Sequence, residues 1–170
     1  IRDRGKIDLG GNVIEAPKPT SSKRRKNEKD FSYIELCDEK GNIGVTDTTG
    51  KVILAPQFDR IYYYNKELHA VRDGFEGIYT TEGKAVIPIS RKYNFVTRHN
   101  LKGGGWYYTV HCGPYEGLCD SRGNDLVAPD KWSDVTDYGG RYKVREGVSA
   151  GIIDRSGNVI VPCAYQDVSR

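Results

Sequence analysis

Residues 151–162 read Gly-Ile-Ile-Asp-Arg-Ser-Gly-Asn-Val-Ile-Val-Pro, and edited copies of this stretch recur along the 170-residue chain. In every copy, a second glycine follows the leading glycine by six residues. A fixed internal spacing with variable steps between copies is typical of one structural unit that is repeated, with length changes in the loops. The leading glycines are Gly5, Gly44, Gly77, Gly117 and Gly151, separated by 39, 33, 40 and 34 residues.

A hairpin turn is predicted directly after each leading glycine. Aspartate at the first turn position can accept a hydrogen bond from the backbone two residues on, and glycine three residues later adopts a left-handed conformation without steric cost. The Asp-x-x-Gly pattern therefore predicts a type I turn that leads into a bulged hairpin. The residues with this predicted structural role are Asp8, Gly11, Asp47, Gly50, Asp120, Gly123, Asp154 and Gly157, with Gly83 in a looser copy.

A short β-branched run and a proline follow each turn, as in Val159-Ile160-Val161 before Pro162. Proline cannot donate a backbone hydrogen bond to a central ladder. We therefore expect each of these strands to end at the proline that follows it. An aromatic residue and then Ile or Val come next, as in Tyr165 and Val168. With another hairpin upstream of each leading glycine, the pattern predicts three short antiparallel strands and a fourth brief one per unit, almost without helix.

The repeats predict one all-β domain over residues 1–170. Its predicted parts are a half-unit at 1–17, a mobile basic loop at 18–30 that lacks an apolar anchor, and units at 31–61, 62–96, 97–135 and 136–168. Unit lengths of about 33–40 residues and ends without obvious closure favour an open curved array of β-meanders and hairpins. A small β-propeller is the alternative, because four strands in roughly 35 to 40 residues is near the length of one blade.

The composition is typical of a globular chain, with 37% hydrophobic and 29% charged residues. No run approaches the roughly 18 apolar residues of a membrane helix, so we expect no membrane span. The formal charge of +3 is too small to indicate a nucleic-acid partner by itself. Nothing at Ile1 resembles a start methionine or a signal peptide, so we expect a fragment or a processed form.

The sequence lacks the motifs of catalysis and metal binding. It has no Gly-x-Ser-x-Gly elbow, no complete phosphate-binding loop and no dinucleotide fingerprint. The four cysteines lie 75, 7 and 44 residues apart, which is neither a zinc spacing nor a dense disulfide framework, so we expect free thiols, with a Cys112–Cys119 pair around the Gly113-Pro114 turn as the alternative. The three histidines have no Cys or His partner at metal spacing. We therefore expect no enzyme, no cofactor and no metal.

Because catalytic and metal-binding motifs are missing, the function that remains is binding of another molecule at the protein surface. Aromatic side chains on neighbouring strands provide a large contact area at low entropic cost. Strand alternation places Tyr108 inward with Trp106, and Tyr107 outward. In the alternative interpretation, the tyrosines fill the core of a chain that has no methionine. The aromatic candidates for a binding face are Tyr63, Trp106, Tyr107 and Trp132.

A basic cluster in the predicted loop is the second candidate site. Clustered positive charge attracts phosphate groups or an acidic partner. In the alternative interpretation, the segment is a solvated insertion without a partner. The cluster consists of Lys23, Arg24, Arg25 and Lys26.

The order Gly-x-Ile-Asp, x-x-Gly, x-Val-Ile-x-Pro, x-x-Tyr-x-Asp-x-Val between Gly151 and Val168 resembles the WG-containing β-repeat family. Units of this family occur in tandem in many bacterial proteins of poorly defined role. The resemblance covers residues 5–17 and about 31–168, and it implies a β-repeat scaffold for interaction without known catalytic residues. The tryptophan that names the family precedes the leading glycine; here those positions hold Arg4, Ile43, Glu76, Glu116 and Ala150.

The repeats and the missing catalytic motifs together favour a non-catalytic module for protein–protein interaction or scaffolding, with another protein as its partner. The alternative is carbohydrate or envelope-polymer binding through exposed aromatic side chains. Nucleic-acid binding through residues 23–26 ranks below both, and it would require a steep dependence on salt concentration.

Overall fold

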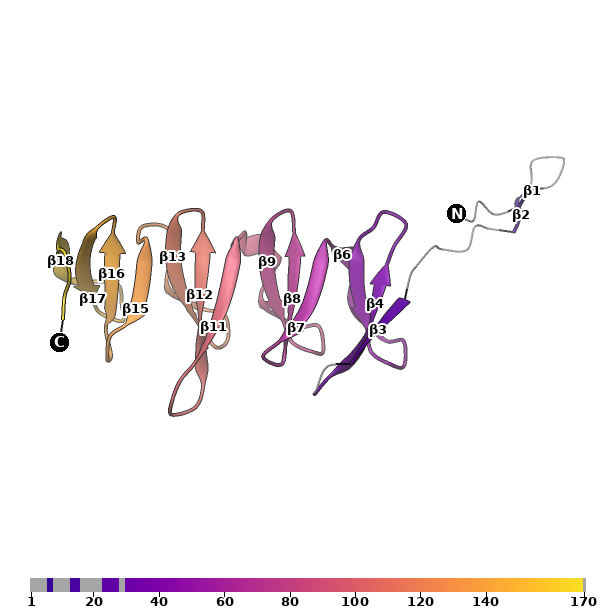
Figure 1. Ribbon diagram of the computed structural model, residues 1–170, viewed down its shortest axis with the longest axis horizontal. Helices are drawn as coiled ribbons and strands as arrows, with labels where there is room; N and C mark the ends of the chain where they lie inside the picture. The colour runs from indigo at the N-terminus through magenta and orange to yellow at the C-terminus, as the bar shows by residue number, and fades with distance from the viewer. Residues whose placement is uncertain (1–5, 8–12, 16–22, 28–29, 170) are drawn as a thin grey trace. The chain divides into compact units, whose positions relative to one another are not determined.

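The computed structural model describes residues 6–7, 13–15, 23–27 and 30–169, and Figure 1 shows their arrangement into strands. Except for a short 3-10 helix at Ile89–Arg91, every regular element in these residues is a β-strand. The predicted all-β class is confirmed. The strands are β1 (Lys6–Ile7), β2 (Val13–Glu15), β3 (Lys23–Asn27), β4 (Ser32–Cys37), β5 (Ile43–Thr46), β6 (Val52–Phe58), β7 (Arg60–Tyr64), β8 (Glu67–Arg72), β9 (Phe75–Tyr79), β10 (Ala85–Ile87), β11 (Phe95–Asn100), β12 (Trp106–Cys112), β13 (Tyr115–Asp120), β14 (Asp125–Val127), β15 (Asp134–Asp137), β16 (Tyr142–Glu146), β17 (Ser149–Ile153) and β18 (Val159–Tyr165).

The strands form four antiparallel sheets of four strands each, and β1 pairs with β2 separately. We number the sheets in chain order: β3 to β6, β7 to β10, β11 to β14 and β15 to β18. Sequential strands are neighbours within each sheet, so each sheet is a meander, and no sheet of the described residues closes into a barrel. The predicted tandem hairpin repeats are confirmed.

The sheet boundaries differ from the boundaries of the predicted units. The Ile or Val that ends a predicted unit lies in the first strand of the following sheet: Ile61 in β7, Val96 in β11 and Val135 in β15. By packing, the chain divides into two compact units, residues 1–73 with 80–83 and residues 74–79 with 84–170. The second unit contains β9, β10 and the complete third and fourth sheets.

The leading glycines are required because the fourth strand of each sheet passes very close to the third. A Cβ atom at Gly44 would lie 2.6 Å from the backbone nitrogen of Pro56, and one at Gly151 would lie 2.6 Å from the backbone oxygen of Val161. The register between the third and fourth strands shifts in all four sheets, as at a β-bulge. Glycine is the residue that permits so close an approach of two backbones.

The predicted Asp-x-x-Gly turns form at Asp47, Asp120 and Asp154. The Oδ1 atom of Asp47 accepts hydrogen bonds from the backbone N–H groups of Thr49 at 2.8 Å and Lys51 at 2.9 Å, and Asp120 and Asp154 accept equivalent bonds. The hydroxyl of Thr49 also donates to Asp47 and lowers the pKa of its carboxyl group. The closing glycines have left-handed backbones, with φ of +96° at Gly50, +84° at Gly123 and +85° at Gly157.

The looser copy, which begins at Gly77, forms a similar turn at Gly83. The N–H of Gly83 donates to the carbonyl of Thr80 at 2.9 Å, and Gly83 has a φ of +89°. A further turn of the Asp-x-x-Gly type joins β4 to β5 at Asp38, where Oδ1 accepts a bond from the N–H of Asn42 at 2.8 Å. The turn at Asp38 was not among the predicted turns, and the predicted turn residues Asp8 and Gly11 lie outside the described residues.

The prediction that a proline ends each fourth strand is wrong for two sheets. Pro56 lies within β6 and Pro162 within β18, whereas β10 and β14 end before Pro88 and Pro129. Each of these strands lies at the edge of its sheet. A proline there removes no ladder hydrogen bond when its nitrogen faces the free side.

The prediction of a loop at residues 18–30 is wrong for residues 23–27, which form strand β3 and pair with β4. The Lys26 ammonium lies 3.8 Å from a carboxylate oxygen of Glu35. Backbone hydrogen bonds to a single neighbour hold an edge strand, and charged side chains suit such an edge because they discourage further pairing. Residues 18–22 and 28–29 lie outside the described residues.

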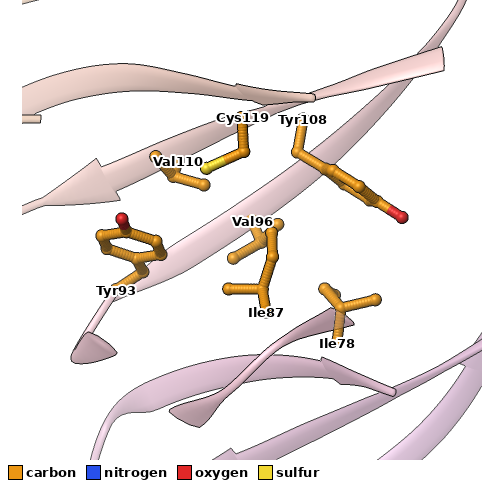
Figure 2. Close-up of a cluster of buried hydrophobic side chains, with 7 residues drawn as sticks. All are labelled: Ile78, Ile87, Tyr93, Val96, Tyr108, Val110 and Cys119. Carbon is orange, nitrogen blue, oxygen red and sulfur yellow. The ribbon is translucent and has the colours of Figure 1, made fainter. Parts of the chain in front are cut away.

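Side chains between neighbouring sheets form two apolar clusters in the second unit. Figure 2 shows the first, in which Ile78 and Ile87 face the side chains of β12 and β13. Members of the first cluster are Ile78, Ile87, Tyr93, Val96, Tyr108, Val110 and Cys119. Members of the second are Leu118, Val127, Trp132, Val135, Tyr142, Val144 and Ile153. Tyr107 packs against the second cluster, so its predicted outward position is wrong. The third sheet is covered on both faces.

The four cysteines are free thiols in the structure, as expected. Cys119 is buried, and its Sγ donates to a carboxylate oxygen of Asp125 at 3.3 Å. Burial, followed by this hydrogen bond, raises the pKa of the Cys119 thiol to about 12. Because the thiol titrates above its unfolded value of about 8.5, its contribution to stability is complete below that pH and is lost as pH rises towards 12.

Cys119 should therefore resist alkylation. We expect iodoacetamide at pH 8 to label the half-buried Cys112 in the folded protein, whereas Cys119 reacts only after unfolding, because the thiolate is the nucleophile. Peptide mass spectrometry after timed labelling measures both rates, with urea-unfolded protein as the control. Equal rates at the two cysteines in the folded protein would contradict the burial of Cys119.

Candidate binding site

The structure separates the four aromatic residues that were predicted to form a binding face. Trp132 is only 7% exposed and belongs to the second apolar cluster, so its predicted exposure is wrong. Tyr63 is half-buried in the first unit, where its ring centroid lies 5.2 Å from that of Phe31. Trp106 and Tyr107 are half-buried neighbours on β12. Of the four, Trp106 and Tyr107 line one cavity together.

That cavity has a volume of about 190 Å³ and lies between the third and fourth sheets; we call it the aromatic pocket. Rings and leucines form most of its wall, with four polar side chains among them. Its lining residues are Leu101, Trp106, Tyr107, Leu118, Leu126 and Tyr142, together with Asp120, Ser121, Asp137 and Arg155.

Hydrogen bonds and cation–π contacts fix the walls of the aromatic pocket. The indole N–H of Trp106 donates to the Tyr108 hydroxyl at 3.0 Å, and the Arg98 guanidinium lies 4.0 Å from the centroid of the indole. On the opposite wall, Arg155 donates to the Tyr142 hydroxyl at 2.7 Å and to a carboxylate oxygen of Asp137 at 3.0 Å. A wall held in this way loses little entropy when a ligand binds.

A second cavity, of about 290 Å³, also borders Tyr107; we call it the polar groove. Strands β11 and β12 form its floor, where Thr97 is opposite Thr109 and His99 is opposite Tyr107. The ring centroids of His99 and Tyr107 lie 5.0 Å apart in a stacked arrangement. The lining residues are Thr97, His99, Tyr107, Thr109, His111, Glu116, Asp134, Val135 and Thr136.

Two carboxyl groups face the polar groove. The Oε2 atom of Glu116 lies 3.7 Å from Nε2 of His111, and only 14% of the Glu116 side chain is exposed. Burial raises the pKa of the Glu116 carboxyl group, and the charge of Asp134 acts in the same direction. The groove therefore holds two neighbouring carboxyl groups in a partly desolvated space.

Glu76 and Glu116 each directly precede a leading glycine, and each links one sheet to the next by a hydrogen bond. The Glu76 carboxylate accepts a hydrogen bond from the backbone N–H of Val96 at 2.9 Å. The Glu116 carboxylate accepts one from Val135 at 3.0 Å. Both valines lie in the first strand of the following sheet. These two roles were not predicted, although a glutamate directly before the leading glycine in two copies is a visible sequence signal.

The basic cluster lies in β3, where Lys26 pairs with Glu35, and the side chains of Lys23, Arg24 and Arg25 lie outside the described part of the structure. Within the described residues, no group of three or more His, Cys, Asp or Glu side chains has the arrangement of a metal site. The described part of the chain also has no helix with the length and apolar character needed to cross a membrane.

A family model described as WG containing repeat matches residues 43–74 and 151–170. The comparisons with curated proteins and with solved structures gave no significant match. The first matched segment begins at Ile43-Gly44 and the second at Gly151, so both begin at or next to a leading glycine. Together with the four meanders, these matches show that residues 43–74 and 151–170 are similar to repeats of the WG-containing β-repeat family.

Proposed function

We propose that this chain is a non-catalytic β-repeat module that binds another protein between its third and fourth sheets. The observation that supports the proposal is the aromatic pocket, whose walls are already held in place without a ligand. Concave sites with mostly apolar walls and a few fixed polar groups are typical of binding sites.

The size of the aromatic pocket suits a single apolar side chain. An apolar cavity of roughly 150 Å³ holds a benzene molecule, and the aromatic pocket has about 190 Å³. One leucine or phenylalanine side chain of a partner therefore fits. Protein interfaces depend on a few such anchors, which enter desolvated pockets rich in aromatic residues and arginine.

An exposed apolar side chain at the pocket extends the contact area. Leu101 lines the pocket and is 46% exposed, so it offers apolar surface next to the opening. Asp120, Asp137 and Arg155 add polar groups to the lining. An apolar centre with polar groups around it is the usual anatomy of a protein interface.

Carbohydrate binding is a second candidate, because the same pocket combines aromatic rings with polar side chains. Trp106 and Tyr107 offer ring faces for stacking, and Asp120 and Ser121 lie near them. Titration of a glycan panel with tryptophan fluorescence as readout tests it. A saturable change with one glycan, lost on Leu101→Glu, would move the proposal from a protein to a carbohydrate.

Affinity capture from source-cell lysate at moderate salt tests the protein-binding proposal. We expect Leu101→Glu to lose the captured partner, because it places a charge beside an apolar pocket. Val148→Glu is the matched control, since Val148 is 85% exposed and lies outside the pocket lining.

A third variant separates the pocket from the basic cluster. When Lys23, Arg24, Arg25 and Lys26 are all alanine, the proposal predicts that the partner is retained at moderate salt. The proposal fails if Leu101→Glu keeps the partner, or if the alanine variant alone loses it.

A further inference from the structure

The polar groove lacks the lysine and arginine that pair with a carboxylate on the equivalent surface of the fourth sheet. The motif Trp132-Ser133-Asp134-Val135 recurs as Tyr165-Gln166-Asp167-Val168, so Asp134 and Asp167 hold the same repeat position. Asp167 forms ion pairs with Lys143 and Arg145 of β16, the second at 3.5 Å. In the fourth repeat, the carboxylate at this position thus binds an ammonium and a guanidinium group.

The third sheet has no lysine or arginine at the corresponding positions. Val110 is opposite Gly117 in the same way that Val144 is opposite Gly151, so Thr109 and His111 correspond to Lys143 and Arg145. Among the described residues that line the polar groove, none is lysine or arginine. Arg145, which is opposite Asp134 in the register, directs its guanidinium to Asp167.

The chemistry of the polar groove suits an external cation. Glu116 and Asp134 supply two carboxylates, and Glu116 uses one oxygen for the Val135 N–H while the other faces His111. The groove volume of about 290 Å³ accommodates a long side chain. The stacked rings of His99 and Tyr107 add aromatic surface, over which a guanidinium group packs favourably.

We propose that the polar groove binds the ammonium or guanidinium group of a lysine or arginine side chain from the partner protein. The assignment to a partner rests on the proposed function, whereas the cation site itself does not. Tyr107 borders both cavities, so one partner segment carrying an apolar and a basic side chain would occupy the aromatic pocket and the polar groove together.

Nuclear magnetic resonance titration tests the cation site without any partner. The probes are N-acetyl-arginine amide and N-acetyl-lysine amide at constant ionic strength, with N-acetyl-glutamine amide as the neutral control. We expect saturable shifts of the Thr97, Thr109 and Thr136 amide signals with the two cationic probes alone. Absence of saturable shifts, or equal shifts with the neutral probe, would overturn the proposal.

Three variants locate the binding in the polar groove. Asp134→Asn removes one carboxylate with almost no change of shape, and Thr109→Lys with His111→Arg supplies the internal cations of the fourth sheet. Each of these two changes should weaken the binding of the cationic probes about tenfold or more, a loss of about 1.4 kcal/mol in binding free energy. Asp130→Asn removes an exposed carboxylate outside the groove and should leave binding unchanged. The remaining amide signals report whether each variant is folded.

The source of the cation is decided by two further measurements. Spermidine that binds more tightly than both amides would assign the groove to a free polyamine and overturn the side-chain assignment. If the amides bind as expected, Asp134→Asn should also weaken capture of the partner. Amide binding combined with a failed capture experiment would leave the cation site standing and reject the protein-binding proposal.

Discussion

We expect the Gly117→Ala variant to be less stable than the parent chain by about 3 kcal/mol, near the upper end for overpacking in a closely packed site. An added Cβ atom would lie 2.7 Å from the backbone nitrogen of Pro129, and also against the backbone oxygen of Val127. Backbone atoms cannot rotate away as a side chain does, so β13 and β14 must separate. Urea unfolding followed by circular dichroism measures the difference.

The control for this variant is Gly103→Ala. Gly103 has no atom within 4 Å of its added Cβ, and its backbone is not left-handed. Its free energy of unfolding should change by no more than about 0.5 kcal/mol, as at ordinary surface sites. Similar losses in the two variants would mean that the crossing of β13 and β14 does not explain the leading glycine.

The Trp132→Ala variant should lose about 4 kcal/mol of stability, as is usual when a buried tryptophan is truncated. The indole packs in the second apolar cluster and is only 7% exposed. Its removal opens a cavity between the third and fourth sheets. Thermal and urea unfolding both report the loss.

Tyr165→Ala is the matched control, because Tyr165 holds the same repeat position and is 56% exposed. Since its ring is mostly in solvent, we expect a loss below about 1 kcal/mol. A stable Trp132→Ala variant with weakened partner binding would restore the sequence-based prediction that Trp132 belongs to a binding face.

The local structure of each repeat was predictable because its signals lie within about ten residues of one another. Asp47 and Gly50 specify a turn by side-chain hydrogen bonding and a left-handed glycine, and both act within one hairpin. The role of Gly44 was not predictable in the same way. Its contact is with Pro56, across a strand pair whose register shift has no local signature.

The faces of the strands were predicted less well, because alternation alone does not say what covers each face. Tyr107 and Tyr108 lie on opposite faces of their strand, and the prediction placed Tyr108 towards the core and Tyr107 towards solvent. In the second unit both faces of the third sheet are covered, so Tyr108 enters the first cluster while Tyr107 packs against the second.

The candidate site was predictable only in part, since it is assembled from two sheets. Trp106 and Tyr107 were recognisable as neighbouring aromatic residues, and both line the aromatic pocket. Asp137 and Arg155 join them from the fourth sheet and the turn before β18. The polar groove likewise combines residues between 97 and 136, whose proximity follows from sheet packing and from no short motif.

Hydrogen–deuterium exchange of the captured complex, compared with the free chain, tests binding between the third and fourth sheets most directly. We expect slower exchange on binding in two segments, residues 97–107 and 134–142, which contribute to both cavities. Exchange at residues 23–27 should be unchanged. Protection confined to residues 23–27, with none in the other two segments, would contradict the assignment and identify the basic strand as the binding site.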